Sequence, residues 1–270
     1  MFEWTDKAQD ALNKVPFFAR KKAKGKIENY VRDKGTGLVV TVEDVKAAKQ
    51  QFLSGISKDI KGYQADRCFG ASGCPNSANS CESVLDRAQE VLENQDILSF
   101  LKKSVKGDLK YHHEFRLSAA DCPNCCSQPQ IKDFGIIGTV IPALCDETCS
   151  LCHACEDACP DNCIKTEDRG ENRLPSIDSS LCLMCGKCIE ACPTGTICEK
   201  KRGFRVLLGG RLGRHPRLAL EIDRIFSEDE VIAILDNVLK FYKNHSKDGE
   251  RFSRIFNETD MAQISVIPEK

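Results

Sequence analysis

The sequence has almost no net charge, few aromatic residues and no long apolar run. Lys and Arg number 39 against 40 Asp and Glu, so no overall field favours a nucleic acid or an anionic membrane. No segment approaches the roughly 18 consecutive apolar residues of a membrane-spanning helix. Residues 1–15 interleave charges throughout and lack the apolar core of a signal peptide. We therefore expect a cytoplasmic protein that binds neither nucleic acid nor membrane.

Cysteine, by contrast, is abundant, with 17 residues in a chain of 270. The number is odd, and most of the cysteines are grouped at spacings typical of metal ligands, which favours a reducing compartment over a disulfide framework. A hydrophobic content of 41% is sufficient for the core of one large domain or two smaller ones. The composition therefore predicts a metal-containing protein with a hydrophobic core.

The densest group of cysteines consists of two copies of the pattern C-x2-C-x2-C-x3-C-P. This is the spacing of bacterial two-cluster ferredoxins, in which the fourth cysteine of each copy ligates the cluster of the other copy. We therefore predict two [4Fe-4S] clusters. One would be held by Cys149, Cys152, Cys155 and Cys192, and the other by Cys182, Cys185, Cys188 and Cys159. A zinc site or disulfides are the alternatives, but zinc sites usually pair two C-x2-C units across a longer gap.

Two sparser cysteine pairs precede this array. Cys68 and Cys74 form a C-x5-C pair, and Cys122 and Cys126 form a C-x3-C pair. The combination resembles the siroheme–[4Fe-4S] signature of the sulfite and nitrite reductases. The resemblance implies a third [4Fe-4S] cluster on these cysteines, and it implies that Cys126 bridges this cluster to the siroheme iron.

Three further segments resemble the same family. They correspond to the strand that leads to the cysteines, its continuation after them, and a late strand with a glycine loop: Arg116–Asn124, Gln130–Gly135 and Val206–Arg214. The resemblance covers roughly residues 63–260. Because a ferredoxin-like array separates these segments, their order resembles that of dissimilatory and anaerobic sulfite reductase subunits.

Such a site would need cations, because siroheme carries carboxylates that are costly to bury unpaired. Residues 200–217 contain seven Lys and Arg and no acid, and the arginine fork suits carboxylates best. We assign Arg211 and Arg214 to the cofactor. Arg116, just before the C-x3-C pair, is the best candidate for a catalytic cation that faces an anionic substrate. A plain charged surface or a nucleic-acid stripe is the alternative.

Other residues near the motifs carry weaker signals. Glu114 stands where the family commonly has a cation, and it would weaken anion binding if it faced the site. His112 and His113 could donate protons, although histidines outside a motif are more often structural. The remaining cysteines match neither motif and are expected to be small buried hydrophobic residues: Cys81, Cys125, Cys145, Cys163 and Cys198.

Hydrophobic periodicity predicts an α+β fold. Strands are expected at residues 113–118, 134–141 and 204–208, and helices at 82–100, 227–245 and 251–256. Residues 1–60 lack cysteine and are expected to form a small helical module, which resembles a domain of protochlorophyllide-reductase-type proteins. We predict a siroheme–[4Fe-4S] reductase domain from residues 61–144 and 199–270, interrupted by an inserted ferredoxin domain at residues 145–198.

These features predict an oxidoreductase. Electrons would pass from the two ferredoxin clusters to the siroheme-coupled centre, and the substrate would be a small anion, either sulfite or, as an alternative, nitrite. The implied partner is an electron donor protein such as a ferredoxin or a flavoprotein. Larger reductases carry a substrate-side domain that this chain lacks, so a homo-oligomer in which a second copy completes the pocket is a further option. A non-catalytic iron–sulfur electron carrier is the alternative from another class.

Overall fold

The computed structural model describes residues 2–35, 37–166 and 174–266. The chain divides into two compact units, one formed by residues 1–60 and 105–112 and the other by residues 61–104 and 113–270. Within the described residues, no helix is both long enough and apolar enough to cross a membrane.

The first unit is a helical module with a short pair of strands. Helices α1, α2 and α3 span Asp6–Asn13, Phe17–Lys34 and Val42–Asp59, and β1 (Glu3–Trp4) pairs in parallel with β2 (Val39–Val40). The start of α3 is fixed by the predicted capping box, because the Thr41 side chain accepts from the Asp44 N–H and the Asp44 carboxylate accepts from the Thr41 N–H. A cavity of about 550 Å³ lies between the three helices and is lined by apolar residues and lysines.

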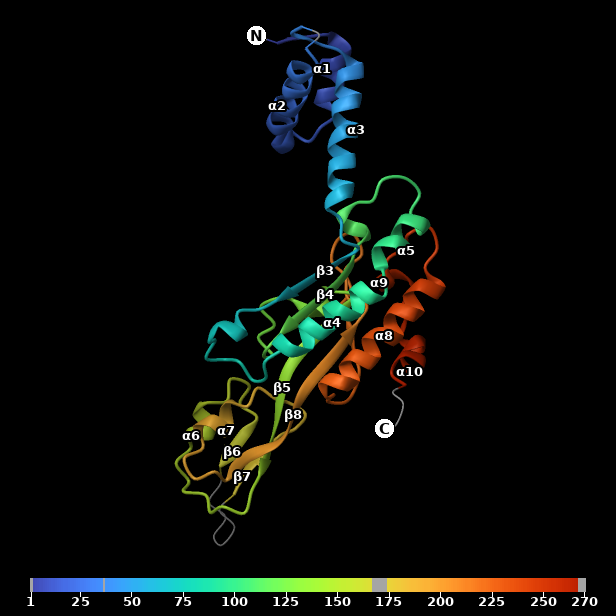
Figure 1. Cartoon of the computed structure of the whole chain (residues 1–270). Coiled ribbons are helices and arrows are strands. Elements are labelled where there is room, and N and C mark those ends of the chain that lie inside the picture. The colour runs from blue at the N-terminus through green and yellow to red at the C-terminus, as the bar shows by residue number, and fades with distance from the viewer. Residues whose placement is uncertain (1, 36, 167–173, 267–270) are drawn as a thin grey trace. The chain divides into compact units, whose positions relative to one another are not determined.

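The second unit is built on a five-stranded mixed sheet with the order β3-β4-β5-β8-β9. The strands span Tyr63–Arg67 (β3), Phe115–Ala120 (β4), Phe134–Leu144 (β5), Ile197–Leu208 (β8) and Leu220–Glu221 (β9). Strands β3, β4 and β5 run parallel, whereas β8 is antiparallel to both β5 and β9. The strands predicted near residues 113–118, 134–141 and 204–208 are therefore confirmed, but β5 and β8 extend further than the sequence indicated (Figure 1).

Helices cover one face of this sheet. They span Glu82–Asn94 (α4), Ile97–Ser104 (α5), Glu228–His245 (α8), Phe252–Ile255 (α9) and Met261–Ile264 (α10). The single helix predicted at residues 82–100 is wrong, because the chain breaks at Asp96, whose φ of +46° is left-handed and whose carboxylate caps the Ser99 N–H. The Ser227 capping box that begins α8 is confirmed.

Aromatic rings fill the space between the sheet and the helices. The ring of Phe115 on β4 lies 5.8 Å from that of Tyr242 on α8 and 5.9 Å from that of Phe252 on α9. Because side chains alternate along a strand, Phe115 and Leu117 face the helices while Arg116 and Ser118 face the opposite side. The sheet therefore has one apolar, helix-covered face and one face that can carry polar groups.

A buried carboxylate joins the sheet to the C-terminal helices. Asp133, which is 1% exposed, accepts hydrogen bonds from the Arg116 N–H at 3.0 Å and the Ser253 N–H at 3.1 Å. It also pairs with the Arg251 guanidinium at 3.0 Å. One side chain thus fixes β4 and α9 against the start of β5.

Residues 145–198 lie between the long strands β5 and β8 in the same compact unit. They contain α6 (Ala154–Asp157), α7 (Lys187–Ala191) and the antiparallel pair β6 (Ile164–Thr166) and β7 (Pro175–Ile177). The expectation that Cys145 and Cys198 are buried hydrophobic residues is wrong. Both are partly exposed, and they form a disulfide, because the end of β5 and the start of β8 bring their Cα atoms to 6.0 Å.

Replacing the buried carboxylate tests its structural role. Asp133→Ala should lower the free energy of unfolding by about 3–5 kcal/mol, because it leaves the Arg251 charge and two backbone N–H groups without their acceptor. The matched control is Asp66→Ala, which removes an exposed partner of Lys132 and should cost less than about 1 kcal/mol. Denaturant unfolding of both variants under anoxia measures the difference, and equal losses would contradict the assignment.

Candidate metal centres

The two sparse cysteine pairs meet at the ends of two neighbouring parallel strands. Cys68 follows β3 and Cys122 follows β4, and the Cys68 N–H donates to the Ala119 carbonyl at 3.1 Å. Burial raises the pKa of the Cys122 thiol, and the nearby thiols of Cys68, Cys126 and Cys74 add to the rise against an opposing backbone hydrogen bond. The structure thus brings together the cysteines for which the sequence predicts a third cluster.

These thiols differ in their access to solvent. Cys122 is buried, Cys68 and Cys74 are partly buried, and Cys126 is exposed. Two backbone N–H groups point at the Cys68 sulfur, from Gly70 at 3.4 Å and from Asp121 at 3.3 Å. Such donors stabilise a thiolate and tune an iron–sulfur cluster. The set is therefore suited to a cluster with one outward-facing corner at Cys126.

A residue that the sequence did not single out holds the two cysteine loops together. The buried carboxylate of Asp121 accepts from the Cys81 N–H at 3.0 Å and from the Ser77 hydroxyl at 3.3 Å. Its backbone carbonyl accepts from the N–H groups of Ala78 and Asn79 at 2.9 and 3.0 Å. An acid directly before a cysteine was visible in the sequence, but its partners lie about 40 residues away and only the fold shows them.

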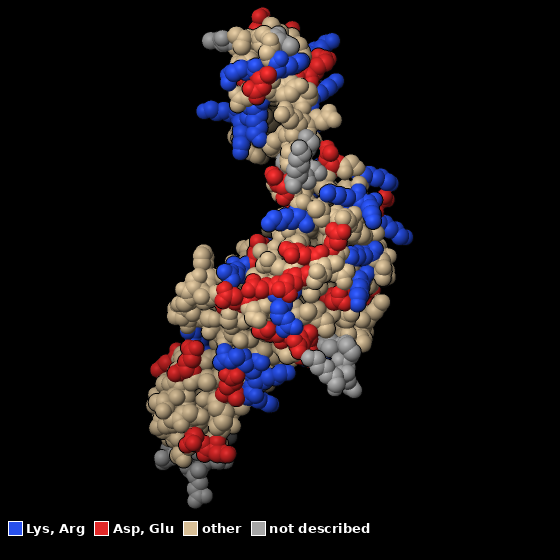
Figure 2. All heavy atoms as spheres, viewed as in Figure 1, with Lys and Arg blue, Asp and Glu red and all other residues tan. Residues whose placement is uncertain are grey.

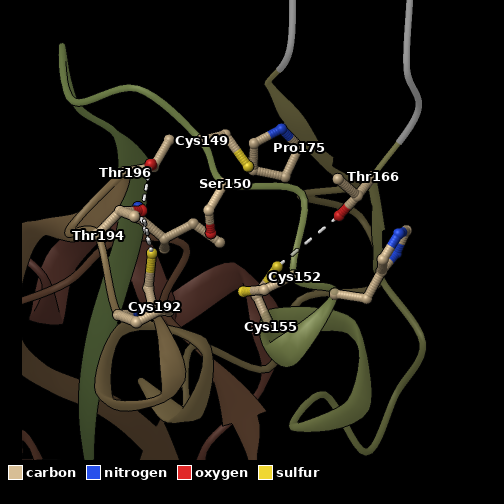
Figure 3. A pocket seen from close by; sticks show the side chains of 12 residues that line it. Cys149, Ser150, Cys152, Cys155, Thr166, Pro175, Cys192, Thr194 and Thr196 are labelled. Atoms are coloured by element: carbon tan, nitrogen blue, oxygen red, sulfur yellow. Dashed lines mark hydrogen bonds between the residues drawn. The ribbon is translucent and has the colours of Figure 1, made fainter.

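The first ferredoxin-like motif surrounds a small cavity. Its lining includes all the cysteines predicted for the first cluster: Cys149, Cys152, Cys155 and Cys192. Figure 3 shows these side chains around the same space, with Thr194 and Thr196 beside Cys192. The fourth cysteine comes from the second motif, as the crossed ligation of two-cluster ferredoxins requires.

The second motif surrounds a matching cavity with one additional thiol. Its lining includes the predicted cysteines and one more: Cys159, Cys182, Cys185, Cys188 and Cys163. We expected Cys163 to be a buried hydrophobic residue, and it is only 6% exposed, but its sulfur lies 3.3 Å from that of Cys159. Across the described ranges, no three His, Cys, Asp or Glu side chains converge as ligands of a single metal ion.

Both cavities are framed by the same backbone conformation. Leu151 and Met184 stand at the same position of the two motifs, have left-handed φ values of +53° and +59°, and donate to the sulfurs of Cys149 and Cys182 at 3.4 Å. A non-glycine residue in this conformation is strained, and the strain recurs where a loop must wrap a ligand. The repeat in geometry therefore follows the repeat in sequence.

The second motif lies directly against the sparse pairs. The Val140 N–H and the Thr139 hydroxyl donate to the Met184 carbonyl at 2.8 and 2.9 Å. Val140 also belongs to one buried cluster with Cys122, and Ile189 of α7 packs against that cluster. The three cysteine sites are therefore ordered, with the Cys182 site between the Cys149 site and the Cys122 site.

The predicted cation stripe is largely consumed by the protein itself. Arg205 forms two hydrogen bonds of 2.6 Å with Glu221, and Arg202 pairs with Glu199. Arg211 donates to the carbonyls of His215 and Ser253. Figure 2 shows Lys and Arg interspersed with Asp and Glu over the sheet-containing unit on the face that it draws. The expectation of a continuous anion-binding stripe is therefore wrong.

Two arginines keep donors that the protein does not use. Arg214 is exposed and makes no side-chain hydrogen bond or ion pair in the described part of the chain, and the buried Nε of Arg116 has no hydrogen-bond partner there. The loop of Arg214 adjoins the cysteine loop, because the Ala219 N–H donates to the Gln130 carbonyl at 2.8 Å. A macrocycle with carboxylates fits these donors beside Cys126, whereas Arg211 has fewer donors to offer.

Glu114 has a structural role rather than a place among these cations. It is 3% exposed and accepts from the Lys61 N–H at 3.0 Å and from the Gln64 amide at 2.7 Å. This departure from the family pattern therefore anchors the start of β3. His112 and His113 lie in the turn before β4, and their role as proton donors stays a prediction.

The contact between the cysteine loops can be tested at a glycine. A Cβ atom on Gly70 would lie 2.0 Å from the Asp121 carboxylate, so Gly70→Ala must displace that carboxylate. We expect iron and labile sulfide to fall by about a third, because one of three clusters is lost while the other two remain. Ser72→Ala, in the same loop but exposed, is the control and should keep the full content. Full content in both variants would contradict the proposed dependence on Asp121.

Comparison with known proteins places this geometry in a family. The family model described as the nitrite and sulphite reductase 4Fe-4S domain matches residues 69–266. The model described as the proto-chlorophyllide reductase 57 kD subunit matches residues 4–49, which confirms the resemblance of the helical module.

Two curated proteins and one solved structure are similar to the chain. The coenzyme F420-dependent sulfite reductase of Methanocaldococcus jannaschii is 31% identical over 195 residues, which cover 71% of this chain and 29% of that protein. One polypeptide of the light-independent protochlorophyllide reductase of Chlorobium limicola is 45% identical over 47 residues, 17% of this chain and 9% of that protein. The chain thus spans less than a third of either relative.

The crystal structure of dissimilatory sulfite reductase I aligns with a TM-score of 0.52 and 16% identity over 76% of this chain and 52% of that chain, which supports the α+β fold. Because the reductase family model matches most of the sequence, including three of the four cysteines that meet behind β3 and β4, the chain belongs to the nitrite and sulphite reductase 4Fe-4S domain family, apart from its N-terminal helical module.

Proposed function

We propose that the chain is a siroheme- and iron–sulfur-dependent oxidoreductase that reduces a small anion, with sulfite reduced to sulfide. The observation that carries the proposal is the ordered row of cysteine sites that ends at the exposed thiol of Cys126. A row of closely spaced clusters suits a reaction that needs several electrons at one metal centre. The family membership and the sulfite reductase relative support the same reaction class.

The order of the sites suggests the direction of electron flow. A donor protein such as a ferredoxin or a flavoprotein would deliver electrons to the Cys149 site, which is the site farthest from Cys122 along the row. The Cys182 site would pass them on to the Cys122 site, because Val140 contacts both the Cys182–Cys188 loop and Cys122. Buried apolar packing between these two sites excludes water from the path.

The residues around Cys126 would hold the macrocycle and the substrate. Siroheme, when bound, supplies an iron with an open axial position for the anion. Cys126 would be the protein ligand shared between the cluster and that iron, and Arg214 would pair with a carboxylate of the macrocycle. Arg116 would hold the anion through its partnerless Nε, because a buried donor without an acceptor is costly. Arginine stays charged at any physiological pH, so it orients the anion and supplies no proton.

The pocket that this chain supplies is partial. Of the predicted cations, Arg202, Arg205 and Arg217 are bound within the protein, which leaves few to neutralise a polycarboxylate cofactor. We therefore propose that a second copy of the chain or another subunit completes the site.

The same observation favours one alternative function. If the internal use of the arginines means that no macrocycle binds, the chain would be an iron–sulfur electron carrier whose Cys122 site hands electrons to another protein through Cys126.

Spectroscopy separates the two functions. Protein prepared under anoxia with siroheme supplied should show macrocycle absorption together with about twelve irons per chain from clusters. Cys126→Ser should lose the macrocycle signal coupled to the cluster but keep the two ferredoxin clusters. Ser127→Ala, at the neighbouring position, is the control. Iron and labile sulfide at full content without any macrocycle absorption would rule out the reductase and support the carrier.

Steady-state assays test Arg116. With a reduced viologen as donor, Arg116→Gln should lower kcat/KM for sulfite at least about tenfold, because one charge-assisted contact to the anion is lost. Arg87→Gln removes an exposed arginine paired with Glu228 and should leave the rate unchanged. Parallel assays with nitrite identify the substrate, and an unchanged rate in Arg116→Gln would remove this arginine from the site.

A further inference from the structure

The second ferredoxin site contains more thiols than a cubane cluster has corners. Five cysteines line its cavity: Cys159, Cys163, Cys182, Cys185 and Cys188. A [4Fe-4S] cluster takes four thiolates, one at each iron. One thiol is therefore surplus, and the question is which one and for what.

Three of the five are held by the motif loop in the way seen at the other site. The Met184 N–H donates to the Cys182 sulfur at 3.4 Å, as the Leu151 N–H does to the Cys149 sulfur. The surplus therefore lies between the remaining two, Cys159 and Cys163. Their sulfurs are 3.3 Å apart, so the two thiols occupy the same corner of the cavity.

A tight turn produces this juxtaposition. Between the two cysteines the chain reads Pro160-Asp161-Asn162, and the Asn162 N–H donates to the Cys159 carbonyl at 3.3 Å. Asn162 has a left-handed φ of +52°, a conformation that asparagine tolerates better than most residues. The turn folds Cys163 back toward Cys159, and the Asp178 N–H fixes the Cys163 carbonyl at 2.8 Å.

The first site has no such thiol and serves as an internal comparison. Cys192 is the counterpart of Cys159, and the residue four positions later is Thr196 in place of Cys163. Thr196 is fully buried, and its hydroxyl lies 2.8 Å from that of Thr194. The lining of the first cavity contains only the cysteines that the motif assigns to it. The additional thiol is therefore specific to the site nearest Cys122.

We infer that Cys159 and Cys163 are interchangeable ligands for one corner of the second [4Fe-4S] cluster. The inference rests on the proposed function, because it requires that the cluster is bound. In the exchange, the iron–sulfur bond to Cys159 breaks and a bond to Cys163 forms, while the thiol proton moves from Cys163 to the released Cys159 sulfur. The step is neutral in protons and electrons and needs no further reactant.

The two ligand sets connect the cluster to different parts of the fold. Cys159 follows α6, which carries Cys155 of the first site, whereas Cys163 immediately precedes β6. Loss of one ligand through oxidation or displacement would therefore leave the central cluster in place, although it would no longer share α6 with its neighbour. The relay would stay continuous at the position where it cannot be bypassed.

Single and double variants test the inference on the full chain prepared under anoxia. Cys159→Ala and Cys163→Thr should each keep the wild-type iron and labile sulfide content, because the other cysteine holds the corner. The double variant should lose about a third of the iron, equivalent to one of three clusters. Cys192→Ala is the matched control at the first site, and it should lose about a third as a single variant because no second thiol is available there.

Electron paramagnetic resonance of the reduced proteins supplies a second readout. Cys159→Ala should keep the signals of both ferredoxin clusters, with an altered signal for the second, and Cys159→Ser should match it if Cys163 and not the serine oxygen is the ligand. The signal of the first cluster reports that each variant is folded. Loss of a cluster in Cys159→Ala and Cys159→Ser, or in Cys163→Thr alone, overturns the inference. Absence of both clusters from the wild-type protein would instead overturn the proposed function.

Discussion

The parallel pairing of β3 with β4 is the constraint on which the candidate site depends. It brings the residues after the two strands to the same edge of the sheet, so that Cys68 and Cys122 can share one ligand set although they are 54 positions apart (122 − 68) in the sequence. The Asp121 carboxylate and carbonyl then tie one loop to the other. Without this pairing the C-x5-C and C-x3-C pairs would be unrelated loops.

Much of the chemistry could be predicted from the sequence because cysteine spacing is local information. The crossed set of Cys192 with the first motif follows from the spacing alone, and the structure places these residues around one cavity. What failed depends on contacts between distant residues. The disulfide of Cys145 with Cys198 requires the register of β5 against β8, and the use of Arg205 requires knowing that Glu221 lies across the strand pair.

The arginines show why composition alone overestimates a charged site. A stretch of seven cations without acids suggested a surface ready for carboxylates, yet strand pairing supplied Glu221 from outside the stretch and irregular backbone supplied carbonyls as acceptors. The useful signal is not the number of cations but the donors left over after the fold has taken its share. By that measure Arg116 and Arg214 stand apart from their neighbours.

The unbroken length of β5 and β8 has a consequence for timing. The two strands pair from Phe134–Leu208 at one end to Leu144–Ile197 at the other, and the disulfide follows directly beyond. A carrier joined by a flexible tether must wait for a productive encounter before each transfer, so its rate depends on solvent viscosity and tether length. Here the ladder holds donor and acceptor at one separation, and transfer between them would be governed by tunnelling distance and driving force instead of by diffusion.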